Sequence, residues 1–150
     1  MQHANKLLTM LCLACLVLMT GGVQAENSQD FGDYVVHFNA LNTDLLPPKV
    51  ATEYGIKRSG NRAMLNVVVL RKVLGATGQP VPASVTGTAT ALSGQQRELT
   101  LREIREPNAI YYISDFGVDH EETLRFQLKV RPEGESDIFQ VEFRQQFFSR

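Results

Sequence analysis

The chain has 150 residues, a formal net charge of −1, and a composition that is 43% hydrophobic and 21% charged. This length fits one domain, and the apolar content is enough for a hydrophobic core and excludes wholesale disorder. The near-neutral charge lacks the basic excess that is typical of general nucleic-acid-binding proteins. Composition therefore predicts a single folded domain that binds no nucleic acid, and it points to no particular activity.

The first 25 residues have the organisation of a secretory signal peptide. Lys6 gives a short positive start, 7–19 is an almost unbroken apolar run, and Val23 and Ala25 are small enough for the pockets of a signal peptidase. The apolar run is shorter than the roughly 20 residues that a membrane span needs. The sequence predicts cleavage after Ala25 and a periplasmic product without a membrane span, with an uncleaved anchor as the alternative.

Both cysteines, Cys12 and Cys15, lie inside this apolar run. A lipoprotein cleavage site before Cys15 is a weaker alternative, because Cys12 stands where an aliphatic residue is expected. If the signal is removed, the mature chain has no cysteine for a disulfide, a thiolate metal site or a nucleophile. The mature protein must then be held together by its core alone.

The remaining residues predict a strand-rich domain. Residues 26–32 are polar and are expected to form a flexible lead-in to a single domain over 33–150. Alternating or continuous apolar patterns predict about seven strands, at 34–41, 63–72, 83–92, 97–105, 109–116, 124–131 and 138–148. In the strand over 97–105 the apolar parity changes before Ile104, which predicts a β-bulge near Arg102 and Glu103.

One short helix is expected near 47–54. Two prolines fit its first turn, where backbone donors have no internal partner, and Gly55 is a natural stop. Val50 and Tyr54 would share one face of this helix. Seven short strands with a single small helix favour an all-β fold, an antiparallel immunoglobulin-like β-sandwich, with a Greek-key barrel as the alternative.

Several segments occur together in the order that is typical of one bacterial family. They are 36–41, 54–56 with Arg58 and Ser59, 65–67, Arg105 and Glu106, 109–113 and 143–147. Through these segments, from about Asp33 to Phe148, the chain resembles the family called domain of unknown function 4426. The resemblance implies a small exported, mostly β protein of proteobacteria. It implies no activity, so no catalytic role is carried over to any residue.

Charge clusters most tightly in the turn over 115–122, which contains Asp115, Asp119, His120, Glu121 and Glu122. Oxygen ligands at short spacing suit calcium or magnesium, and a histidine beside carboxylates favours a transition metal. The spacing, however, matches neither an EF-hand loop nor the zinc-protease motif. A solvated turn whose charges discourage edge pairing is the simpler interpretation. A metal-binding or hydrolytic protein that uses this acidic turn is the alternative.

Other catalytic motifs are missing, since the sequence has no Gly-x-Ser-x-Gly elbow and no Ser-x-x-Lys. The leading hypothesis is therefore an uncharacterised exported protein, a non-enzymatic binding module without a cofactor, whose partner is an envelope protein or component. Tyr111 and Phe148 are the candidate residues for contact with such a partner. A small-ligand binder that uses His37, Asn39 and Asn42 near the helix is a further alternative.

Overall fold

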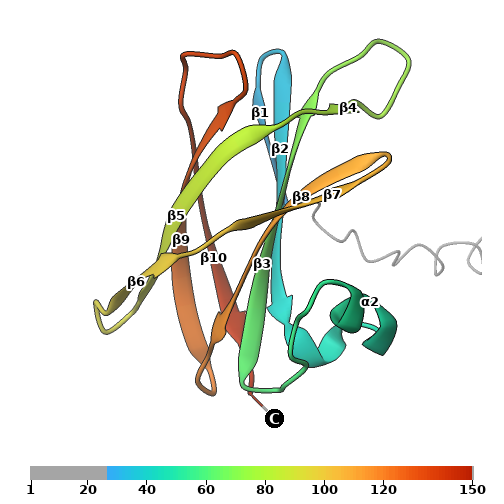
Figure 1. The fold of residues 1–150 in the computed structure, drawn as a ribbon. Helices are drawn as coiled ribbons and strands as arrows, with labels where there is room; N and C mark the ends of the chain where they lie inside the picture. Colours follow the sequence, from blue (N-terminus) through green and yellow to red (C-terminus); the bar gives the residue numbers. More distant parts are fainter. Residues whose placement is uncertain (1–26, 150) are drawn as a thin grey trace, which may run out of the picture.

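The computed structural model describes residues 27–149, which form two layers of β-strands (Figure 1). The elements are β1 (Ser28–Phe31), β2 (Tyr34–Asn42), the 3-10 helix η1 (Thr43–Leu45), α2 (Pro48–Glu53), β3 (Arg62–Arg71), β4 (Gln79–Pro80), β5 (Ala83–Ala91), β6 (Gln96–Leu99), β7 (Arg102–Glu106), β8 (Ala109–Gly117), β9 (Glu122–Pro132) and β10 (Phe139–Phe147). The helix expected near 47–54 is present as α2.

The strands form two antiparallel sheets. Sheet A has the order β1-β2-β3-β8-β7, with β4 added to β3, and sheet B has the order β10-β9-β5-β6. Every sheet pairing is antiparallel, and neither sheet closes on itself. The predicted β-sandwich is therefore confirmed, and the barrel alternative is wrong because the strands divide between two separate sheets.

The main core lies between the sheets and follows the alternation in the sequence. On β9, Leu124, Phe126, Leu128 and Val130 are buried, while the alternate residues Arg125, Gln127 and Lys129 lie on the opposite face. Aromatic rings join the two layers across the core: the ring of Phe143 on β10 stacks on Phe38 of β2, with centroids 4.5 Å apart, and on Phe126, with centroids 4.7 Å apart. The described residues contain no cysteine and therefore no disulfide. Burial of these apolar and aromatic side chains is the main source of stability for this part of the chain.

A second apolar cluster lies on the outer face of sheet A, under α2. Its buried members are Ala51, Ile56, Met64 and Ile113. The Tyr54 ring packs over the ring of Tyr111 on β8, with centroids 6.1 Å apart, and the Tyr54 hydroxyl donates a hydrogen bond of 2.5 Å to Glu106. The short helix thus covers part of one sheet, while no comparable helix lies on sheet B in the described part of the chain (Figure 1).

The N-terminal lead-in differs from the prediction. Residues 26–32 were expected to be flexible, but Ser28–Phe31 form β1, which pairs antiparallel with the first half of β2. The segment is polar because β1 is an edge strand whose first three side chains are exposed. Its backbone makes the sheet hydrogen bonds, and the Phe31 ring stacks on Phe139 at 4.5 Å. The polar pattern therefore does not indicate this strand, because β1 is held by backbone pairing with β2 and by the ring of Phe31.

The predicted strand over 97–105 is also different. It is divided into β6, which belongs to sheet B, and β7, which belongs to sheet A. Figure 1 shows this segment crossing the molecule from one layer to the other. Leu99 is buried in the main core, whereas Ile104 packs in the cluster under α2. The change of parity therefore reflects a change of sheet, and the predicted bulge near Arg102 and Glu103 is wrong.

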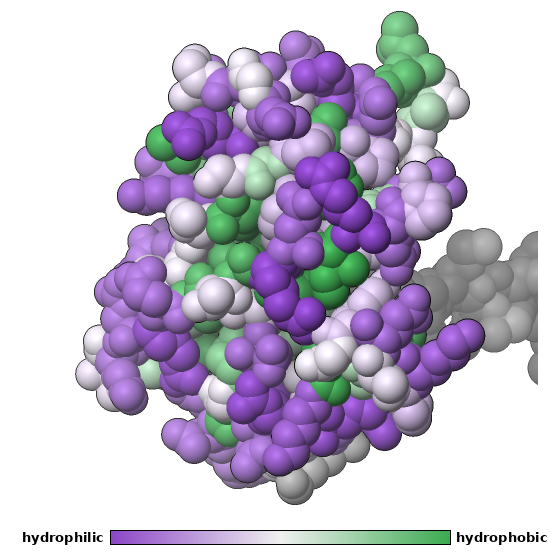
Figure 2. All heavy atoms as spheres, viewed as in Figure 1, coloured by the Kyte–Doolittle hydropathy of each residue, from purple (hydrophilic) through white to green (hydrophobic). Residues whose placement is uncertain are grey.

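On the side of the sandwich that faces the viewer in Figure 1, the first half of β5 in sheet B and the strand β7 in sheet A are not paired with each other. Figure 2 shows hydrophobic surface in the middle of this view, framed by hydrophilic residues. The Tyr112 hydroxyl accepts a hydrogen bond of 2.7 Å from the Ala83 backbone N–H and donates one of 3.0 Å to Glu103, which is paired with Arg105. The Arg105 guanidinium holds the pKa of Glu103 below its usual range, and burial raises the pKa of Tyr112. A polar network thus links the two layers where strand pairing is missing.

Candidate functional site

The outer face of sheet B is formed by polar side chains from four strands, and we call it the polar face. Alternation places the buried residues of β5, β9 and β10 in the core and turns the residues between them to solvent. Its members are Ser84, Thr86, Thr88, Thr90, Gln96, Glu98, Thr123, Arg125, Gln127, Lys129, Arg131, Gln140, Glu142, Arg144 and Gln146. The face is therefore a broad array of hydrogen-bonding groups.

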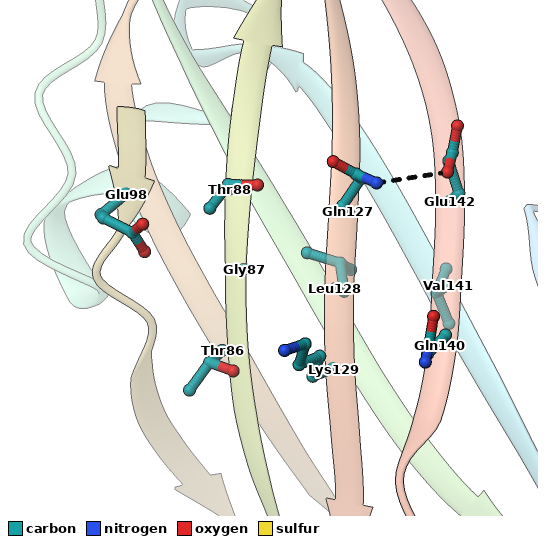
Figure 3. A pocket seen from close by; sticks show the side chains of 10 residues that line it. All are labelled: Thr86, Gly87, Thr88, Glu98, Gln127, Leu128, Lys129, Gln140, Val141 and Glu142. Carbon is teal, nitrogen blue, oxygen red and sulfur yellow. Dashed lines mark hydrogen bonds between the residues drawn. The ribbon is translucent and has the colours of Figure 1, made fainter. Parts of the chain in front are cut away.

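The centre of the polar face is hollowed into a groove of about 360 Å³. Figure 3 shows its polar lining side chains, which come from β6, β5, β9 and β10: Glu98, Thr86, Thr88, Gln127, Lys129, Gln140 and Glu142. Gln127 donates a hydrogen bond of 3.5 Å to Glu142, and most of the other groups are exposed. The groove thus offers hydroxyl, amide, ammonium and carboxylate groups to a ligand.

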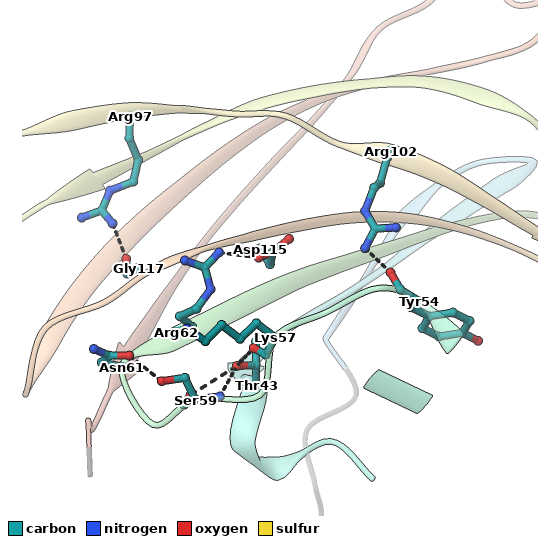
Figure 4. A network of polar contacts seen from close by, with 10 residues as sticks. All are labelled: Thr43, Tyr54, Lys57, Ser59, Asn61, Arg62, Arg97, Arg102, Asp115 and Gly117. Atoms are coloured by element: carbon teal, nitrogen blue, oxygen red, sulfur yellow. Dashed lines mark hydrogen bonds and ion pairs between the residues drawn. The ribbon is translucent and has the colours of Figure 1, made fainter. Parts of the chain in front are cut away.

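The acidic turn over 115–122 connects β8 of sheet A to β9 of sheet B. At its start, Asp115 forms an ion pair with Arg62 of β3 (Figure 4). At its end, Glu122 accepts a hydrogen bond of 2.6 Å from Arg97 of β6 and another of 3.0 Å from the backbone N–H of Asp119. The carboxylates at the two margins of the turn are therefore both engaged in ion pairs, Asp115 within sheet A and Glu122 within sheet B.

The middle of the turn points to solvent. His120 Nδ1 lies 3.0 Å from the backbone oxygen of Ser149, and its Nε2 lies 4.0 Å from a carboxylate oxygen of Glu121. His120 and Glu121 are both exposed. Over residues 27–149, no group of three or more histidine, cysteine, aspartate or glutamate side chains is placed to hold a metal ion. The geometry therefore gives no support to a metal site in this turn.

The predicted contact residue Phe148 lies just after β10 and is 52% exposed. Its ring stands edge-on to His120, with centroids 6.3 Å apart, and its backbone oxygen accepts a hydrogen bond of 3.4 Å from Asn42. Phe148, His120 and Asn42, which are candidates for partner, metal and small-ligand binding respectively, thus meet at one end of the sandwich. Tyr111, in contrast, is half-buried against Tyr54 and faces α2.

The three residues of the small-ligand hypothesis do not converge. His37 and Asn39 lie on the outer face of sheet A, whereas Asn42 bonds to the backbone oxygens of Gly60 and Phe148 at the end of β2. Asn39 stands directly opposite Asn66 on β3, and the Asn66 Oδ1 is buried without a hydrogen-bond partner. Buried polar groups are normally hydrogen-bonded, so the unpaired acceptor of Asn66 is the notable feature of this face.

No pattern in the sequence indicated that the polar face is a candidate binding site. The alternation of β5 and β9 had already separated the outward residues from the core residues. Which strands lie next to each other in sheet B depends on the pairing of β5 with β9, which brings together residues far apart in the chain, such as Thr88 and Gln127. No local pattern in the sequence encodes those pairings.

Comparison with known proteins gives one family and several similar folds. The model of the family "Domain of unknown function (DUF4426)" matches residues 28–150. The crystal structure of a DUF4426 family protein from Pseudomonas aeruginosa PAO1 is 37% identical, with a TM-score of 0.72, over 85% of this chain and 98% of that chain. No curated protein matches the chain.

Two structures of FetP from uropathogenic Escherichia coli strain F11 are also similar. One, of FetP expressed in the periplasm of E. coli, is 10% identical with a TM-score of 0.56, over 82% of this chain and 93% of that chain. The other, a copper-bound variant, is 10% identical with a TM-score of 0.59, over 84% of this chain and 97% of that chain. At this identity the likeness concerns the fold alone.

Proposed function

For a chain that belongs to the DUF4426 family, we propose the role of a non-enzymatic binding protein of the bacterial periplasm, with the polar face of sheet B as its contact surface. The observation that carries the proposal is the groove of about 360 Å³, which four strands line with exposed polar side chains. A rigid sheet that presents many hydrogen-bonding groups suits recognition of a polar partner, an envelope protein or another envelope component.

Export is supported by the sequence pattern of 1–25, which lies outside the described residues. Residues 27–149 contain no helix that is both long and apolar enough to cross a membrane. The expression of FetP in the periplasm of E. coli agrees with the same compartment for a similar fold. Together these observations support a periplasmic protein.

A role without catalysis is supported by the positions of the ionisable groups. Asp115 and Glu122 of the acidic turn are paired with arginines, and the exposed His120 faces the backbone of Ser149. A nucleophile with an adjacent base and an orienting third group is the usual requirement for covalent catalysis. The polar face offers no histidine or cysteine that would meet this requirement.

The proposal includes no metal site like that of the copper-bound FetP variant. Copper sites are commonly built from clustered histidine, cysteine or methionine side chains. In the described residues the only histidines are His37 and His120, which lie on different parts of the sandwich, and the only methionine, Met64, is buried under α2. The proposal therefore rests on the polar face and not on a metal.

Site-specific photocrosslinking in intact cells tests the proposal. A photoreactive residue at Gln127 or Gln140 in the groove is expected to give a discrete adduct with an envelope component. The matched control is Gln29, an exposed glutamine on β1 of the other sheet. Absence of adducts from both groove positions, or equal adducts from Gln29, would contradict a contact surface on the polar face.

A second candidate function, binding of a small polar ligand on the outer face of sheet A, is favoured by the buried, unpaired Oδ1 of Asn66 beside Asn39. A buried acceptor without a donor costs about 1–3 kcal/mol, which a bound donor group would offset. A high-resolution crystal structure of the protein tests this candidate. Density for an organic molecule within hydrogen-bond distance of Asn66 supports it, and an Asn66 that is bonded only to water or protein removes it.

A further inference from the structure

The arginines of the chain fall into two groups. Of the nine arginines in the described residues, six donate a hydrogen bond to another residue of the chain: Arg58, Arg62, Arg71, Arg97, Arg102 and Arg105. The three that donate to no described residue are Arg125, Arg131 and Arg144, and all three belong to the polar face. Within residues 27–149, the guanidinium groups without a described acceptor are therefore concentrated on the polar face.

Two of these three arginines are direct neighbours. Arg144 of β10 stands opposite Arg125 of β9 in the antiparallel register. The Cβ atoms of such a pair lie about 4.5–5.5 Å apart, and like charges in these positions repel each other. No carboxylate forms an ion pair with either arginine in residues 27–149, and the nearest one along β10, Glu142, is bonded to Gln127. The repulsion is therefore not relieved within the described chain.

The other charged residues of the polar face add to the positive charge of the arginine pair. The polar face has four cationic side chains, Arg125, Lys129, Arg131 and Arg144, against the carboxylates of Glu98 and Glu142. The whole chain, in contrast, has a formal net charge of −1. An excess of positive charge on one face of a slightly acidic protein attracts anions to that face.

A separate groove of about 260 Å³ lies at the arginine pair. It is lined by Arg125, Arg144, Thr90 and Thr123, together with the end of β5 and the turn that follows it. Arg125 is half-buried, so that its guanidinium is less hydrated than a fully exposed one, and both threonines are half-buried beside it. The groove therefore combines two guanidinium forks with two hydroxyl donors.

We propose that this arginine groove binds a phosphate group. A guanidinium presents paired donors that match the oxygens of phosphate, and two of them balance the charge of a phosphate dianion. The hydroxyls of Thr90 and Thr123 supply further donors to the remaining oxygens. The inference rests on the proposed use of the polar face for binding, and it specifies a phosphate-bearing ligand for that face.

Titration of inorganic phosphate into the protein expressed from its full-length sequence tests the site, with binding heat measured at an ionic strength of about 0.15 M, where charges more than roughly 8 Å apart are screened. Arg125→Gln and Arg144→Gln are each expected to weaken binding at least about tenfold, since each removes charge-assisted hydrogen bonds. The matched control is Arg131→Gln, which removes the third unpaired arginine of the same face and is expected to change the affinity by less than about twofold.

The melting temperature without phosphate verifies that these variants fold. Because Arg125→Gln and Arg144→Gln remove a like-charge contact, neither is expected to lower it. Absence of phosphate binding to the unaltered protein at millimolar concentration overturns the site. Equal losses in Arg131→Gln and Arg125→Gln also overturn it, because they would show a diffuse attraction of anions in place of a defined groove.

Vesicles distinguish the source of the phosphate once inorganic phosphate is found to bind. Flotation with phosphatidylcholine vesicles that contain phosphatidic acid, lost in Arg125→Gln, assigns a lipid headgroup; no flotation assigns a soluble phosphate compound. The result is separable from that of the crosslinking experiment. Adducts from Gln127 and Gln140 without phosphate binding leave the binding role in place and remove only the phosphate site.

Discussion

At the scale of single residues, position 87 requires a glycine because β5 and β9 approach each other closely there. A Cβ added at Gly87 would lie 2.4 Å from Leu128 Cδ2 and 3.0 Å from the backbone oxygen of Gln127. Because a backbone oxygen of a central strand cannot easily move, β5 and β9 would have to separate. Gly87→Ala is expected to lower the free energy of unfolding by about 1–3 kcal/mol, measured by urea denaturation.

The control for this prediction is Gly117→Ala at the end of β8. A Cβ there would meet no other atom within 4 Å, so the substitution is expected to change stability by less than about 0.5 kcal/mol. Similar losses in the two variants would mean that glycine flexibility, and not the close approach of β5 to β9, explains the effect.

A second residue-scale prediction concerns Tyr54 and alkaline pH. The hydrogen bond to Glu106 raises the pKa of Tyr54 from 10.0 to about 12. The folded state therefore holds the phenol proton more tightly than the unfolded state does. The stabilising effect of this bond is fully present below pH 10 and is lost as the pH rises towards 12. The stability difference between the unaltered protein and Tyr54→Phe is expected to be constant below pH 10 and to shrink above it.

Urea denaturation at a series of pH values measures this difference. Tyr111→Phe is the control, because it alters the neighbouring ring and leaves the bond between Tyr54 and Glu106 in place. The Tyr111→Phe protein should therefore keep the alkaline loss of stability that Tyr54→Phe lacks. A parallel pH profile for the unaltered protein and Tyr54→Phe would rule out the stabilising role of this hydrogen bond.

At the scale of elements, the connection between β8 and β9 depends on one of its carboxylates. The Glu122 side chain is only 11% exposed and accepts hydrogen bonds from Arg97 and from the backbone of Asp119. Glu122→Gln is expected to cost about 1–3 kcal/mol of stability, because it leaves a partly buried guanidinium without its charged acceptor. Thermal or urea denaturation measures the loss.

Glu121→Gln provides the comparison at the adjacent position. The Glu121 side chain is 67% exposed, and its carboxylate lies 4.0 Å from His120 Nε2, so this change is expected to alter stability by less than about 0.5 kcal/mol. If the two variants were equally stable, the pair between Glu122 and Arg97 would contribute nothing to stability, and the acidic turn would act only as a solvated surface.

The elements also show how far the sequence alone could lead. Alternation located the core faces of β2, β5, β9 and β10, because apolar side chains on one parity must be buried together. It failed at β1, where the side chains are polar and the stabilising pairs are backbone hydrogen bonds. It failed again at Ile104, because a bulge and a change of sheet give the same shift of parity. The neighbours across β5 and β9 on the polar face, such as Thr90 and Arg125, depend on register between distant segments, which no local signal encodes.

At the scale of the whole molecule, the pattern of residues 1–25 predicts export with removal of a signal peptide. Cleavage after Ala25 is expected to give a mature chain that begins at Glu26, ahead of β1 at Ser28. Mass spectrometry of protein taken from the periplasmic fraction measures the new N-terminus. An intact Met1 in that protein would contradict cleavage, and a lipid-modified Cys15 would support the lipoprotein alternative.

The ring contacts of β10 have a consequence for the order in which the molecule assembles. Phe139 and Phe143, on the last strand, stack on Phe31 of β1 and Phe38 of β2, on the first two. Contacts that join the two ends of a chain form late, because the whole intervening loop must close first. A chain that emerges from its N-terminus therefore keeps these aromatic faces uncovered until its final strand arrives.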